Sequence, residues 1–177
     1  MLPIHGSGHT IFMGIQAFSD YTSTDHDQLV WKFINEHRAA LASCLDGMSE
    51  QEARAQLVPS KTTLLGLVKH AIFVERVWFE EAPTGFSREE LGLEATPDES
   101  FELTDEDTIS SVSERYRHAL EVSAAAVEGK TGKDIFRGNR RGTMSLAWIQ
   151  LHLLRELAQH CGHAEILREQ IIAARNN

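Results

Sequence analysis

A glutamate and a histidine interrupt an apolar stripe on the longest helical segment of this chain. The segment 145–174 has the spacing of one long helix, and alternating three- and four-residue steps along it follow one face. Along that face lie, in order, Leu146, Ile149, Leu153, Glu156, His160, His163, Leu167 and Ile171. Because apolar residues open and close the stripe, we expect it to face a core, where a carboxylate without a partner is costly. A bound metal ion would offset that cost.

Glu156 and His160 are four residues apart, so a helix presents their side chains one turn apart on the same face. A catalytic metal usually takes three protein ligands and leaves one position open. His70 is the candidate for the third ligand, because it stands in the middle of another apolar stripe, on the helical segment 62–81. The sequence therefore predicts a divalent metal held by His70, Glu156 and His160.

Each of these residues also has a purely structural interpretation. A lone inward histidine is often satisfied by hydrogen bonds within a core. Glu156 could instead form a buried ion pair with Arg76 or Arg155. His163, one turn beyond His160, could be a fourth ligand or a group that orients His160. Metal binding is favoured because three ligand-type residues coincide on two segments that can pack together.

Other side chains have weaker claims to a role in binding. Trp78 is expected to cover the core, and a wall of a substrate cleft is the alternative. The basic run from Arg137 to Arg141 is expected to be a solvated loop, although it could hold an anionic substrate tail. Cys161 neighbours His160, but adjacent helical residues point about 100° apart. A Cys-His nucleophile pair is therefore not expected.

Four helical segments must position these residues. Capping signals and apolar spacing place the helices at about 25–46, 62–81, 104–128 and 145–174. On the first of them, Leu29, Phe33 and Leu41 are expected to face inward. No window of the sequence alternates as a β-strand does. The sequence therefore predicts an all-α fold, a four-helix bundle with one short and two long connections.

Length and charge narrow the possible partners. The chain has 177 residues, with 17 Lys+Arg against 26 Asp+Glu and a formal net charge of -9. One domain is expected, at residues 24–177, after an N-terminal extension at 1–23. The acidic balance argues against nucleic acid and against an anionic membrane as partners. The apolar residues 10–18 are too few to span a bilayer, and two distant cysteines, Cys44 and Cys161, fit a cytoplasmic protein.

Two motifs in the sequence carry a family resemblance. They are formed by residues 59–70 continued by 74–79, and by residues 145–148 followed by 156–165. In order and spacing they resemble the DinB/YfiT-like superfamily of metalloenzymes, and the resemblance covers about residues 24–174. It implies an up-down-down-up four-helix bundle, commonly a homodimer, that holds one divalent metal, often zinc or nickel.

The resemblance also implies ligands and an activity. Much of the superfamily uses three histidines, whereas Glu156 takes the place of the middle one here. This departure moves the resemblance toward the mycothiol-dependent isomerases and transferases. By position, the resemblance implies that the ligands are His70, Glu156 and His160. His163 falls at a position where it implies a residue that contacts a ligand rather than the metal. The implied reaction is transfer or isomerisation through a small thiol such as mycothiol or bacillithiol, whose thiolate attacks an electrophile.

The identity of the metal and the existence of turnover stay open at this point. One carboxylate and two imidazoles suit zinc, nickel and iron alike. No residue of the sequence shows which thiol or which electrophile is used. The alternative functions are a stress-related helical bundle that binds metal without turnover, and a purely structural bundle in which an arginine neutralises Glu156.

Overall fold

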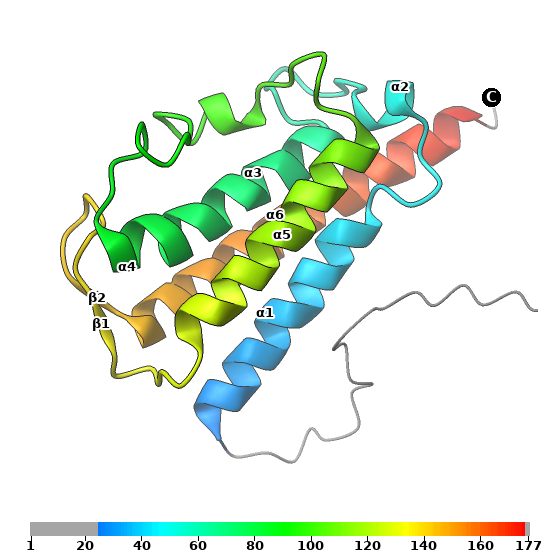
Figure 1. Cartoon of the computed structure of the whole chain (residues 1–177). Helices are drawn as coiled ribbons and strands as arrows, with labels where there is room; N and C mark the ends of the chain where they lie inside the picture. The colour runs from blue at the N-terminus through cyan, green and yellow to red at the C-terminus, as the bar shows by residue number, and fades with distance from the viewer. Residues whose placement is uncertain (1–24, 176–177) are drawn as a thin grey trace, which may run out of the picture.

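Four long helices lie side by side in the computed structural model, which describes residues 25–175 (Figure 1). They are α1 (His26–Ser43), α3 (Leu64–Arg76), α5 (Ile109–Val127) and α6 (Leu146–Arg175). α6 packs against α1 and α3, and α3 also packs against α5. The chain is mostly helical within this range, which confirms the all-α prediction, whereas the predicted extension at 1–23 lies outside the described residues. None of the helices within 25–175 is both long enough and apolar enough to cross a membrane.

Short elements connect the long helices. They are α2 (Glu50–Ala53), the π-helix η1 (Val77–Glu81), α4 (Ala82–Thr84), the 3-10 helix η2 (Glu99–Phe101), β1 (Ile135–Phe136) and β2 (Met144–Ser145). The two strands form an antiparallel hairpin in which Ile135 pairs with Ser145 and Phe136 with Met144. The sequence pattern predicted no strand, because two residues are too few to show an alternation.

Capping residues set where the helices begin. Asp25 caps α1, as its position in the sequence predicted. α5 begins at Ile109 after its cap Thr108, later than the predicted start at about residue 104. Thr104 instead opens a turn, in which the carboxylate of Asp107 accepts a hydrogen bond from the N–H of Thr104 at 2.8 Å. The predicted start of this helix was too early because the same residue types form such turns and cap helices.

A buried ion pair fixes which face of α1 points inward. Nε and Nη2 of Arg38 donate to the two carboxylate oxygens of Glu75 on α3, at 2.8 and 2.6 Å. The hydroxyl of Ser123 on α5 donates to the same carboxylate at 2.8 Å. Phe33, which was expected to face inward, is 43% exposed. That prediction was wrong because it used only the spacing of apolar residues, which does not predict that a charged residue such as Arg38 is buried.

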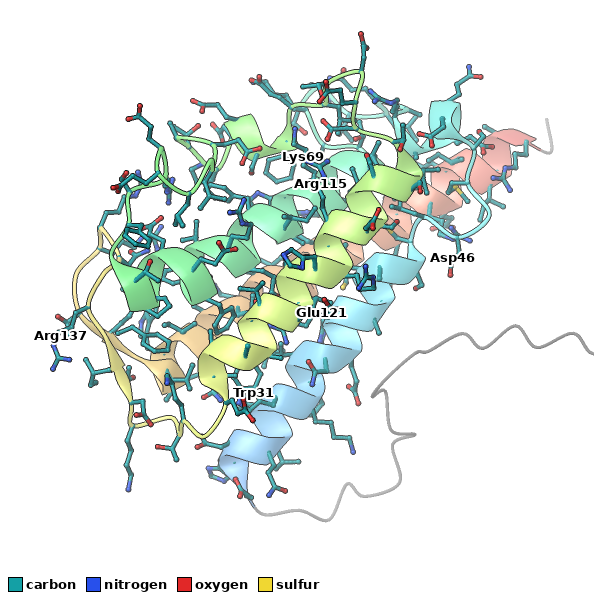
Figure 2. The ribbon with its side chains drawn as sticks, viewed as in Figure 1. Trp31, Asp46, Lys69, Arg115, Glu121 and Arg137 are labelled. Carbon is teal, nitrogen blue, oxygen red and sulfur yellow. The ribbon has the colours of Figure 1, made fainter. Side chains whose placement is uncertain are left out.

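The connection from α4 to α5 runs alongside α3 (Figure 1). Lys69 on α3 holds it, because its Nζ donates to the carbonyl of Glu102 at 2.6 Å and to the carboxylate of Asp107 at 2.9 Å. Arg115 on α5 pairs with the same carboxylate. Figure 2 shows Lys69 and Arg115 close together below this connection. These contacts hold η2 over the side of α3.

Glu75→Gln should lower the free energy of unfolding by about 3 kcal/mol, because Arg38 would keep its charge in the core without a carboxylate partner. Denaturation in urea, followed by the circular dichroism of the helices, measures this loss. The matched control is Glu80→Gln, which removes a half-buried carboxylate paired with Arg76 at 2.6 Å. We expect less than about 1 kcal/mol there. Equal losses of unfolding free energy in the two variants would contradict the larger stabilisation assigned to the Arg38–Glu75 pair.

Candidate metal centre

His70, Glu156 and His160 come together in the structure, one from α3 and two from α6. One potential ligand atom of each residue lies within 4.8 Å of the others. Oε1 of Glu156 is 3.3 Å from Nε2 of His160 and 3.6 Å from Nε2 of His70. Ligand atoms that bind a tetrahedral ion at about 2.1 Å lie roughly 3.4 Å from one another, and the two spacings from Glu156 are close to this value.

The connection above α3 fixes one ring nitrogen of His70. Nδ1 lies 2.7 Å from Oγ of Ser100, and this hydroxyl donates to the carbonyl of Pro97 at 2.5 Å. Because a serine hydroxyl has only one hydrogen, Nδ1 of His70 must be the donor in the first bond, and Nε2 carries the lone pair. Nε2 is buried and makes no hydrogen bond within residues 25–175. The ring itself stacks on Phe101, with 4.1 Å between the centroids.

The lone pair of His70 faces a charged carboxylate. The hydrogen bond with His160 is the main reason that the pKa of Glu156 lies well below its usual range, so this side chain is negative at neutral pH. Burial lowers the pKa of His70, which keeps its imidazole neutral. Two acceptors, Nε2 of His70 and Oε1 of Glu156, therefore face each other at 3.6 Å. A cation bound by both atoms would remove this repulsion, so the residues fit a metal ion.

Glu156 and His160 lie at the edge of the buried face of α6 rather than in its middle. The predicted stripe ran through both residues, but the buried positions that follow Leu153 are Leu157, Cys161, Ala164, Leu167 and Ile171. The side chain of Glu156 is 25% exposed and that of His160 is 13% exposed. The prediction of a carboxylate inside the core was therefore wrong. His163 lies further out and is exposed, with its ring centroid 5.7 Å from that of His160.

The arginines that were considered as partners of Glu156 have other partners. Nε of Arg76 donates to Glu80 at 2.6 Å, and Nη2 of Arg155 lies 2.9 Å from Nδ1 of His152. In the part of the chain that the structure describes, the ion-pair contacts of Glu156 are all with histidines. The alternative of a carboxylate neutralised by arginine therefore has no support in the geometry.

His152 belongs to the site, although the sequence pattern did not single it out. Its Nε2 lies 3.9 Å from Oε2 of Glu156. Its ring stacks on Trp148 and meets Trp78 edge-on, with centroid distances of 5.0 and 4.8 Å. The available signal was its position four residues before Glu156, which puts both side chains on one face of α6.

A pocket lies beside the three converging residues. Trp78, His152, His70 and Glu156 are among the side chains that line it. Trp78 is only 4% exposed, so it packs in the core and also forms part of the pocket wall. It belongs to the π-helix η1, an irregularity that is common near functional sites. The two interpretations of Trp78 drawn from the sequence are therefore compatible.

The two cysteines do not take part in this group. Cys44 and Cys161 are free and buried. Burial raises the pKa of Cys44 to about 12 and that of Cys161 to about 11. The thiol of Cys161 donates to the carbonyl of His37 at 3.3 Å. Thiols that stay protonated are weak nucleophiles, so neither cysteine is suited to attack an electrophile.

The fold and this group together define a helical protein with a His/Glu/His arrangement suited to a divalent metal. The chain belongs to the mycothiol-S-transferase family, because the model of that family matches residues 29–173. This match confirms the resemblance to the DinB/YfiT-like superfamily, whose mycothiol-related group includes the family. A comparison with curated proteins finds no match.

Ser100→Ala should weaken zinc binding by about 10- to 100-fold, because the group that fixes the tautomer and orientation of His70 would be lost. Competition against a chelating dye measures this affinity. The matched control is Ser87→Ala in the same connection, whose hydroxyl donates to Glu90 at 2.7 Å and not to a histidine. The role given to Ser100 is wrong if both variants bind zinc as tightly as the original protein does.

Proposed function

We propose that this chain is a metal-dependent enzyme that transfers or isomerises substrates through a low-molecular-weight thiol. The proposed ligands of the metal are His70, Glu156 and His160. The observation that carries the proposal is the pair of acceptors, Nε2 of His70 and Oε1 of Glu156, that face each other at 3.6 Å. Membership of the mycothiol-S-transferase family supports the thiol chemistry.

A divalent metal bound here would bind the sulfur of the thiol and favour its thiolate form. The side chains of the protein orient a ligand and exclude water. Ser100 holds the His70 ring in one tautomer, and the rings of Trp78 and Phe73 exclude water from one side of the pocket. In a transfer, the thiol loses its proton, sulfur forms a bond to the electrophilic carbon, and the leaving group departs with its electron pair. In an addition no group leaves: the electron pair of the attacked multiple bond moves to its other atom, and that atom takes up a proton.

Several features of this enzyme are part of the proposal. The metal is zinc or nickel, with iron as a further candidate, and the thiol is mycothiol or bacillithiol. The co-substrate is a small electrophile, and the protein acts in the cytoplasm as a homodimer. Residues 24–177 form one domain, an up-down-down-up bundle. The chain directions in Figure 1 support this arrangement, since α1 and α6 run one way and α3 and α5 the other.

Protein purified without chelator and without nickel resin should carry about one divalent ion per chain in elemental analysis. Glu156→Gln keeps the size of the side chain but removes its charge, so we expect zinc affinity to fall by about 100-fold or more with the fold intact. The same variant should lose mycothiol-dependent consumption of monochlorobimane. Glu169→Gln, an exposed change on the same helix, is the matched control for both measurements.

The alternatives predict different results in the same experiment. A metal-loaded protein that consumes no electrophile with any thiol would be a metal-binding bundle without turnover. A protein without bound metal, whose melting temperature does not rise on addition of zinc, would have only a structural role. Unchanged zinc affinity in Glu156→Gln would remove Glu156 from the ligand set.

A further inference from the structure

Two arginines of the β1–β2 connection line the same pocket as the candidate ligands. Arg140 and Arg141 share it with His70 and Glu156. The two arginines make hydrogen bonds through their backbone N–H groups, to Glu81 and to Asn139. Within residues 25–175, neither guanidinium group has a carboxylate partner or any hydrogen bond.

The third arginine of this pocket is already paired. Nε of Arg88 donates to the carboxylate of Glu81 at 2.9 Å, and its Nη1 donates to the carbonyl of Ala95 at 2.7 Å. Its guanidinium also lies over the ring of Phe73, 4.9 Å from the centroid. The unneutralised positive charge of the pocket therefore lies on the β1–β2 connection.

The backbone that carries these two charges is held in place. Nδ2 of Asn139 donates to Oε1 of the buried Glu81 at 2.9 Å, and the N–H of Gly138 donates to the carbonyl of Ala82 at 2.9 Å. A Cβ atom at Gly138 would lie only 2.4 Å from the backbone nitrogen of Gly85. Only glycine allows so close an approach of two backbones. The connection is thus fixed against η1 and α4, with its arginines beside the pocket.

We propose that Arg140 and Arg141 form an anion subsite, which binds a carboxylate of the substrate while its reacting end lies at His70 and Glu156. Guanidinium groups bind carboxylates through paired, charge-assisted hydrogen bonds. In a chain with a net charge of -9, two guanidinium groups at the pocket would attract anions to it. The role of the subsite in turnover rests on the function proposed above, whereas the binding of an anion does not.

Binding of benzoate and benzamide to the zinc-loaded protein tests the subsite, because the two probes have nearly the same shape and differ in charge. Trp78 lines the pocket, so tryptophan fluorescence reports its occupancy. We expect benzoate to bind more tightly than benzamide, and added salt to weaken the binding of benzoate alone. In the double variant Arg140→Gln/Arg141→Gln, affinity for benzoate should fall about tenfold, with benzamide unaffected.

Two further variants sharpen this test. Arg137→Gln removes an arginine of the same connection that points away from the protein in Figure 2, so it should bind benzoate normally. Arg140→Lys/Arg141→Lys keeps both charges and should restore part of the affinity. Equal affinity for benzoate in the double glutamine variant and the original protein would overturn the proposal, because benzoate would then bind elsewhere, as at the metal. Equal affinities for benzoate and benzamide would overturn it as well.

Turnover identifies which substrate carries the carboxylate. Mercaptoacetate and mercaptoethanol are compared as thiols, and iodoacetate and iodoacetamide as electrophiles that lose iodide when the carbon–sulfur bond forms. A loss of kcat/KM in the double glutamine variant for mercaptoacetate alone places the carboxylate on the thiol, and a loss for iodoacetate alone places it on the electrophile. Turnover that is unchanged with all four compounds would overturn the subsite. No turnover with these compounds or with mycothiol or bacillithiol, with the loss of benzoate binding still present, would overturn the proposed function and leave the subsite standing.

Discussion

The hydrogen bond between Nδ1 of His70 and the hydroxyl of Ser100 decides which nitrogen of that imidazole is free. Because the hydroxyl gives its only hydrogen to Pro97, the ring must donate, and its second nitrogen turns a lone pair toward Glu156. That arrangement is unfavourable for two acceptors and favourable for two ligands of one cation. The chemistry of the site therefore depends on a short segment of a surface connection as much as on the helices.

The contacts that hold this segment explain why the site is well defined. Lys69, next to His70 in the sequence, ties the connection to α3 through Glu102 and Asp107. Further along α3, the buried pair of Arg38 and Glu75 fixes α3 against α1. A charged pair with good geometry in a core specifies one alignment of the helices, because a shifted alignment would leave a charge unpaired.

The sequence predicted those parts of the site that follow from helical periodicity. Glu156 and His160 share a face because they are four residues apart, and His70 stood out because it interrupts an apolar stripe. Ser100 could not be identified in this way, since the segment around it has no repeating pattern. The same holds for the contact of Asn139 with Glu81, which joins residues 58 positions apart in the chain.

The errors on the helices have a common origin. Apolar spacing placed Phe33 inward, although the buried face of α1 carries Arg38. It also placed Glu156 in the middle of a buried stripe, although that residue borders a pocket. A hydrophobic pattern locates a face to within about one residue, or about 100° of rotation. The partner of a buried charge and the position of a pocket depend on contacts between distant segments.

The two kinds of residue in this pocket come from different kinds of backbone. The two candidate ligands that line it, His70 and Glu156, lie on α3 and α6, whereas Arg140 and Arg141 lie on the turn between β1 and β2. A lengthened or shortened hairpin would alter the charged wall without moving the helices. Selectivity and reactivity can therefore diverge separately in evolution, with the His/Glu/His framework on the helices retained while the hairpin adapts to a new compound.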